Sequence, residues 1–123
     1  MDFRKSVADT AKLILINVKL YELEKDKEVS RHRISRDTLK RISQRKAIQE
    51  RFVKLLIDEL SELGWTLIKV DNDYALIESE KLTSWIKLSS KRLREEEILN
   101  LESNELSQVF EEYYPNVWMD SED

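Results

Sequence analysis

The stretch that decides the fold runs from Arg33 to Glu78, RISRDTLKRISQRKAIQERFVKLLIDELSELGWTLIKVDNDYALIE. Its centre has the amphipathic spacing of a helix, which we predict at about residues 44–63. Gly64 is the only glycine of the chain, and it stands where the residue after a helix often takes a positive φ, so we expect the helix to end there. The apolar stripe predicted to face the core is Ile48, Phe52, Leu55, Leu56, Leu60 and Leu63.

A short helix is predicted just before this one, in the sequence RDTLKRIS. Ser35 suits its N-cap, and Leu39 and Ile42 have the i, i+3 spacing of a face turned inward. Ser43 is a suitable N-cap for the longer helix that follows. The turn between the two helices contains no glycine and would consist of Ser43 and Gln44.

Two β-favouring runs follow Gly64, namely WTLIKV and YALIE. Asp71, Asn72 and Asp73 separate them, and such residues tolerate the backbone conformations of tight turns. The pattern predicts a β-hairpin. The two aspartates at its tip would be repelled by phosphate, and Lys69 is its only cation.

The first 25 residues predict a helix at about residues 3–25 that is apolar on two sides. A helix of this kind has to be covered on both sides. The second cover is either the C-terminal segment or the same helix of a second protomer, unless one monomer satisfies both sides. The segment EKDKEVSRHRIS that follows has no apolar period and is expected to be a polar connection. The two stripes are Val7, Ala11, Ile14, Val18 and Tyr21 on one side, and Leu13, Ile16, Leu20 and Leu23 on the other.

The C-terminal third predicts further helices. Residues 81–101 form one or two helical stretches, and a last helix begins at Ser103 or Asn104 as its cap and ends at Pro115. Trp65 and Trp85 are expected in the core. We predict one domain over residues 1–123, with a core at about 3–80, a helical acidic extension at about 81–115 and a frayed tail at 116–123.

Charge is distributed very unevenly along the chain, whose net charge is −4. Residues 31–54 hold nine cations and two acids, whereas residues 95–123 hold ten acids and no Lys or Arg. One such block is usually a solvated surface. Two blocks of opposite sign indicate a basic binding face, an acidic segment that competes for that face, or both.

The order of elements in residues 33–78, preceded by the N-terminal helix, resembles the winged helix-turn-helix family. The resemblance implies an α+β, mainly helical fold of three helices plus a β-hairpin, here with additional C-terminal helices. It also implies that the helix starting near Gln44 enters the major groove of DNA. A rigid helix as the reading element favours double-stranded DNA over RNA.

We divide the candidate nucleic-acid-binding residues by their chemistry. Gln44 and Arg51 can bond to base edges, Glu50 can accept a hydrogen bond from cytosine, and Ala47 allows close approach of the backbone. Arg45 and Lys46 would stand in the first helical turn, where an anion is favoured. The full set is Arg31, Arg33, Arg36, Lys40, Arg41, Gln44, Arg45, Lys46, Ala47, Glu50, Arg51 and Lys54.

The sequence offers few of the residues that catalytic sites use. The chain has no cysteine and one glycine, and its one histidine, His32, is expected to be an ordinary polar loop residue. We expect no catalytic residue, no metal and no cofactor. The N-terminal segment has neither a signal peptide nor a membrane span, so a cytoplasmic protein is the default expectation.

Three functions remain open. The first is a small DNA-binding transcriptional regulator, with a homodimer through the N-terminal helix and the C-terminal helices as one arrangement. The second is a protein–protein interaction module that uses the winged fold, in which the acidic C-terminal region docks a basic partner or shields the basic face. The third is an acidic inhibitor of a nucleic-acid-binding enzyme, and the basic block speaks against it.

Overall fold

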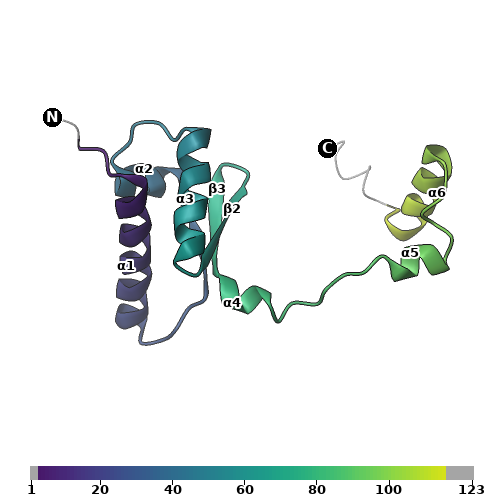
Figure 1. Ribbon diagram of the computed structural model, residues 1–123, viewed down its shortest axis with the longest axis horizontal. Coiled ribbons are helices and arrows are strands. Elements are labelled where there is room, and N and C mark those ends of the chain that lie inside the picture. Colours follow the sequence, from purple (N-terminus) through teal and green to yellow (C-terminus); the bar gives the residue numbers. More distant parts are fainter. Residues whose placement is uncertain (1–2, 116–123) are drawn as a thin grey trace. The chain divides into compact units, whose positions relative to one another are not determined.

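The computed structural model describes residues 3–115, so the expected frayed tail at 116–123 lies outside the described residues. The chain divides into two compact units, Met1–Trp85 and Ile86–Asp123, which we call unit 1 and unit 2. Within the described residues the fold is α+β, with six helices and a three-stranded antiparallel sheet (Figure 1). The single domain expected over residues 1–123 stays a prediction.

Helix α1, Val7–Lys25, opens unit 1. It starts at Val7 because the side chain of Ser6 accepts a hydrogen bond from the backbone N–H of Asp9 at 3.0 Å, which caps the helix. The first predicted stripe is buried at its three central positions, whereas much of the second stripe is exposed. The buried positions are Ala11, Ile14 and Val18, and the exposed ones are Ile16, Leu20 and Leu23.

Strand β1, Arg31–Ile34, lies where a polar connection was expected, so that expectation was wrong. The strand pairs antiparallel with β3, and only Ile34 is buried. Its own residues therefore carry almost no apolar alternation, and its conformation comes from the hydrogen bonds of a partner strand about forty residues away in sequence. His32 belongs to this strand rather than to a loop, where its Nε2 lies 3.0 Å from the carbonyl of Val29.

Helix α2, Arg36–Ser43, has the predicted bounds. The predicted cap is confirmed, because Ser35 Oγ accepts from the backbone N–H of Thr38 at 3.1 Å. Ser43 was wrongly predicted to cap the next helix. It is the buried last residue of α2, and its Oγ donates to the carbonyl of Leu39 at 2.7 Å.

Helix α3, Glu50–Glu62, begins six residues later than predicted. Residues 44–49 form a loop instead of the first turns of the helix. Gln44 makes the turn that lacks a glycine, since it takes the left-handed conformation with φ 55° and ψ 43° at the end of α2. Ile48 fits the helical stripe in sequence, but it is a buried loop residue that precedes the helix.

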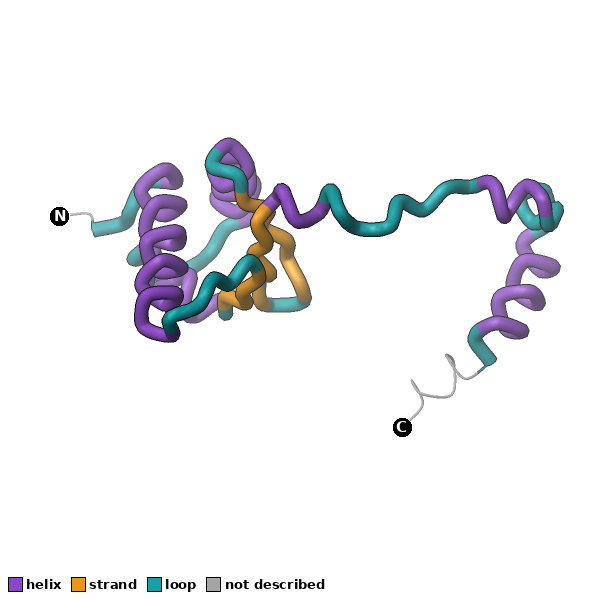
Figure 2. The backbone as a smooth tube through the Cα atoms, turned by 90° about the horizontal axis from the view of Figure 1, so that it is seen from below, coloured by secondary structure: helices purple, strands orange, loops and turns teal. Residues whose placement is uncertain are grey.

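The predicted hairpin is confirmed as strands β2, Trp65–Val70, and β3, Asp73–Glu78. Gly64 has the expected positive φ, 89°, between α3 and β2. The strand order is β1-β3-β2, so β1 and β2 are the two edges of the sheet, which Figure 2 shows in orange. A one-turn helix, α4, Ser79–Leu82, follows β3.

One apolar core holds unit 1 together. Helix α3 packs against α1 and β2, and α1 also packs against α2. Trp65 is partly buried against this core, but Trp85 is 59% exposed, so its predicted place in the core was wrong. The buried apolar side chains among the described residues are Ala11, Ile14, Val18, Ile34, Leu39, Ile48, Phe52, Val53, Leu56, Leu60, Leu67, Tyr74, Leu76 and Ile77.

A carboxylate fixes the connection between α1 and β1. The backbone N–H of Val29 donates to the side chain of Glu22 at 2.8 Å, and this hydrogen bond lowers the pKa of Glu22 below its ordinary value. The Lys19 ammonium group, 3.4 Å from the same carboxylate, acts in the same direction. In the unfolded chain Glu22 has no such donors, so the charged form is favoured by folding.

This contact makes the stability of unit 1 depend on pH. A depressed carboxylate pKa contributes stability that is present above the unfolded pKa and is lost as the pH falls through the folded pKa. We expect Glu22→Gln to lower the midpoint of urea unfolding at about pH 7 and to have a smaller effect at about pH 3. Glu24→Gln, an exposed carboxylate on the same helix, is the control for the loss of one charge. An equal effect of Glu22→Gln at both pH values would contradict the assignment.

Unit 2 contains helix α5, Lys91–Glu95, and helix α6, Ser103–Tyr113. The last helix was predicted, but its N-cap is Glu102 rather than Ser103 or Asn104. Glu102 and Glu105 form a capping box, in which the backbone N–H of Glu102 donates to Glu105 Oε1 at 3.3 Å. No described residue of unit 2 is buried, and Leu106, Phe110 and Tyr113 on the apolar face of α6 are exposed.

Candidate nucleic-acid interface

The loop between α2 and α3 is held in place by Arg45. Its guanidinium group donates to the backbone carbonyl of Lys5 at 2.9 Å and lies 4.0 Å from the ring centre of Phe52. Its Nε is buried and has no hydrogen-bond partner among the described residues. Arg45 was predicted to contact nucleic acid, but these contacts give it a structural role between the N-terminal segment and α3.

Arg36 fixes the other end of the same loop. Its side chain donates to the carbonyl of Ile48 at 3.3 Å, and its backbone N–H donates to Asp73 Oδ1 at 3.3 Å. A second predicted site cation therefore connects the loop and the hairpin to the start of α2. The predicted repulsion of phosphate by Asp73 is also reduced, because its Oδ2 lies 3.5 Å from the Arg33 guanidinium group.

The different roles of neighbouring cations in this loop can be tested. Arg45→Ala should lower the free energy of unfolding by about 1–2 kcal/mol, because it removes a hydrogen bond and a cation–π contact. Lys46→Ala, at an exposed position one residue further, should change it by less than about 0.5 kcal/mol. Urea unfolding followed by circular dichroism measures both values. Equal effects of the two substitutions would refute the structural role of Arg45.

The exposed surface of α3 carries two cations and one acid, Glu50, in its first half and only acidic charges in its second half. Arg51 and Lys54 are exposed in the first half, and Asp58 and Glu62 are exposed in the second. Leu55, on the same face, is 43% exposed and was wrongly predicted to face inward. The helix can therefore place two cations against an anionic partner only with its N-terminal half.

A depression of about 320 Å³ lies between the start of α3 and the hairpin. Three of the residues that line it are cations from separate elements, Arg36 of α2, Lys54 of α3 and Lys69 of β2. Glu50 lies in the same depression. Lys69 was not among the predicted site residues, because its proximity to Lys54 depends on the packing of β2 against α3 and leaves no local signal in the sequence.

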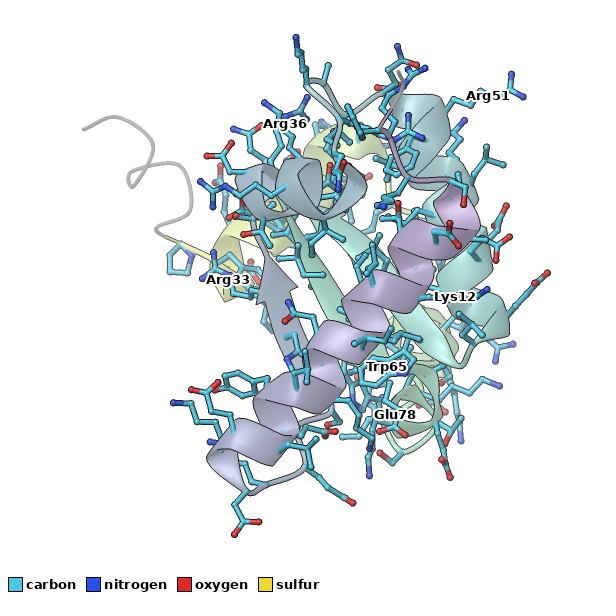
Figure 3. The ribbon with its side chains drawn as sticks, turned by 90° about the vertical axis from the view of Figure 1, so that its left-hand side faces the viewer. Lys12, Arg33, Arg36, Arg51, Trp65 and Glu78 are labelled. Carbon is cyan, nitrogen blue, oxygen red and sulfur yellow. The ribbon has the colours of Figure 1, made fainter. Side chains whose placement is uncertain are left out.

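Two predicted site residues lie elsewhere on unit 1. Arg31 and Arg33 belong to β1, the edge of the sheet opposite to β2, and line a different depression. Figure 3 shows Arg36 and Arg51 toward the top of the view and Arg33 lower down, although the Arg33 guanidinium group and the Arg36 backbone N–H both contact Asp73. The structure therefore does not gather all nine cations of residues 31–54 on one surface.

The remaining predicted residues are placed as follows. Lys40 is half-buried and Arg41 is exposed, both on α2, while Gln44, Lys46 and Ala47 are exposed in the loop. Since Gln44 precedes α3 by six residues, it cannot stand in the first turn of that helix. The exposed members of the predicted set are Arg31, Arg33, Arg41, Gln44, Lys46, Ala47, Glu50, Arg51 and Lys54, and the half-buried members are Arg36, Lys40 and Arg45.

His32 packs between aromatic rings instead of meeting other metal-binding side chains. Its ring centre lies 6.1 Å from those of Tyr21 and Trp65. Among residues 3–115, no three His, Cys, Asp or Glu side chains lie close enough together to hold a metal ion. No helix in the described part of the chain has the length and apolar character that crossing a membrane requires.

Comparisons with models of protein families, with curated proteins and with solved structures give no match to this chain. The function is therefore inferred from the geometry of unit 1 and from the chemistry of its exposed residues.

Proposed function

We propose that unit 1 is a winged-helix domain that binds double-stranded DNA, with the first half of α3 in the major groove and the β2–β3 hairpin beside it. The order of its elements, α1-β1-α2-α3-β2-β3, supports this proposal, because three helices followed by a hairpin that completes a small sheet is the arrangement that the winged-helix resemblance implies.

The observation that carries the proposal is the convergence of cations from separate segments. Lys54 of α3 and Lys69 of β2 line the same depression, and Arg51 is exposed on the turn of α3 before Lys54. Lys46 is exposed in the loop that leads into α3. Folding thus brings together charges that the sequence separates, which is what a groove lined by phosphates requires.

Each of these side chains has a proposed role. Arg51, on the outward face of α3, bonds to a base edge, and the O6 and N7 atoms of guanine fit its guanidinium group best. Lys46, Lys54 and Lys69 bind phosphates and set the orientation of the domain on the duplex. Arg36 and Arg45 hold the loop and the helix in the position that makes these contacts. A small duplex-binding domain of this kind fits the regulation of transcription.

The salt dependence of binding tests the proposal. Fluorescence anisotropy with a labelled random-sequence duplex, at about 50 to about 200 mM salt, should give a slope of log affinity against log salt of about −3, since three lysines neutralise phosphates. Single-stranded RNA of the same length should bind more weakly. Absent or salt-independent duplex binding would refute the proposal, and tighter RNA binding would refute the choice of DNA.

A further inference from the structure

Strand β1 has a free edge, because β3 pairs with one side of it and no strand within the described residues pairs with the other side. The backbone N–H of Glu78 donates to the carbonyl of Ser30 at 2.9 Å, which fixes the alternation of hydrogen bonds along the β1–β3 pair. His32 therefore bonds to β3, whereas the N–H and C=O groups of Arg31 and Arg33 point away from the sheet. These backbone groups are available to another extended chain.

A depression of about 460 Å³ lies between β1 and the helices α1 and α2. Its apolar lining includes Ile14 and Val18 of α1 and Ile42 of α2. His32 and Ile34 line it from β1, on the face of the sheet that is turned toward the core. Successive side chains of an added strand alternate between the two faces of the sheet, so every second one would point into this depression. Apolar side chains fit there best.

The other face of β1 carries cations. Arg31 and Arg33 are exposed, and their spacing of two residues places both side chains on the same face of the strand. Asp73 lies 3.5 Å from the Arg33 guanidinium group and matches part of its charge, whereas no carboxylate of residues 3–115 forms an ion pair with Arg31. The Glu22 carboxylate attracts His32, but no described acidic residue lines the depression. The edge therefore favours acidic side chains on the face of the arginines.

The two arginines and the free backbone groups also decide between the possible occupants. Pairing of β1 with β1 of a second copy would bring arginines opposite one another, and like charges at opposite positions destabilise a sheet. A nucleic-acid phosphate can accept from the guanidinium groups, but it has no donor for the free carbonyls of β1. An extended peptide supplies both a donor and an acceptor at every second residue.

We infer that β1 binds an extended segment of a partner protein, which adds to the three-stranded sheet as an antiparallel strand and carries acidic and apolar side chains in alternation. The acidic residues lie opposite Arg31 and Arg33 and exchange backbone hydrogen bonds with them. The apolar side chains occupy the depression between β1 and α1. Lys69 belongs to the opposite edge strand, so this site is separate from the proposed DNA contacts.

A synthetic peptide in which glutamate and valine alternate is the probe for this site. Fluorescence anisotropy of the labelled peptide with the full chain should show saturable binding. A peptide in which glutamine replaces glutamate should bind at least about tenfold more weakly, because it keeps the backbone and loses the charges. No binding of the glutamate peptide up to about 1 mM, or equal binding of both peptides, would overturn the inference.

Methylation of the peptide nitrogens separates strand addition from charge attraction. In an antiparallel pair, the residues that exchange hydrogen bonds with Arg31 and Arg33 lie directly opposite them, and these are the glutamates. Methyl groups on the glutamate nitrogens should therefore abolish binding. Methyl groups on the valine nitrogens, which point away from β1, should weaken it far less. Equal effects of the two methylations would refute the added strand.

Two double variants with the same change in net charge connect the peptide to β1. Arg31→Glu with Arg33→Glu should weaken peptide binding by at least about tenfold, whereas Arg51→Glu with Lys54→Glu should weaken it only slightly. All four side chains are exposed, and circular dichroism checks that both variants are folded. Equal losses of peptide affinity would mean that the peptide follows net charge and not β1. Duplex DNA is absent from these measurements, so the peptide site and the proposed function can fail independently.

Hydrogen exchange of the backbone amides locates the bound peptide. In the chain alone, the amides of Arg31 and Arg33 should exchange fast, and the amide of His32 should exchange slowly because it bonds to β3. Saturating glutamate–valine peptide should slow the exchange of the two arginine amides by at least about tenfold. Unchanged exchange at both amides with the peptide bound would place the peptide elsewhere and overturn the inference.

Discussion

Reversing the charges of Arg51 and Lys54 together, by Arg51→Glu and Lys54→Glu, is expected to lower the affinity of the chain for duplex DNA on the order of 100-fold or more. Each lost contact contributes about 1–3 kcal/mol, and the two new carboxylates add repulsion from the phosphates. Both side chains are exposed, so the fold of unit 1 should be unaffected. Fluorescence anisotropy at constant salt measures the loss.

The control is a double reversal with the same change in net charge at the far end of α1. Lys25→Glu and Lys27→Glu lie at and just beyond the C-terminal end of that helix and are exposed. Binding should weaken only severalfold, through the long-range field of the protein, and this loss should disappear as salt is raised. Equal losses of DNA affinity for the two double variants would mean that binding depends on net charge alone. In that case α3 would not be the element that contacts DNA.

Replacing Leu56 by alanine is expected to lower the free energy of unfolding of unit 1 by about 2–5 kcal/mol, which is a large part of the stability of a small domain. Leu56 is fully buried, with 0% of its surface exposed, where α3 packs against α1 and β2. The substitution leaves a cavity that the surrounding core can fill only in part. Urea unfolding followed by circular dichroism gives the value.

The adjacent residue provides the matched control. Leu55→Ala makes the same chemical change on the same helix, but Leu55 is 43% exposed on the outward face. Its effect should be below about 1 kcal/mol, partly because alanine is the better helix former. If the two substitutions lower the free energy of unfolding equally, α3 does not have the orientation described. Arg51 and Lys54 would then not face outward as described.

The two leucines also show why the sequence alone could not place the interface. Leu55 and Val53 lie at the two borders of the apolar stripe that contains Leu56. The helical period alone does not show which of the two faces the core. The structure buries Val53 and exposes Leu55. The rotation of the helix is decided by packing against α1 and the sheet, which no local pattern encodes.

The start of α3 is a second example. The apolar stripe of α3 continues in sequence to Ile48, and Ser43 has a side chain that can cap a helix. The sequence pattern therefore predicted a helix that begins at about residue 44. Two long-range hydrogen bonds hold the loop open instead, from Arg45 to the carbonyl of Lys5 and from Arg36 to the carbonyl of Ile48. Because of these contacts, Arg45 and Arg36 have a structural role, although both were predicted to lie on the binding face.

Several elements of this fold could be predicted because their signals are local. The cap at Ser35, the positive φ of Gly64, the turn at Asp71 and the amphipathic period act between residues a few positions apart, so they can be recognised without knowing the fold. Tertiary structure alone decided the strand at residues 31–34, the first residue of α3 and the meeting of Lys54 with Lys69. These features depend on contacts between residues that are distant in sequence, and the energy of such contacts exists only once the chain has folded.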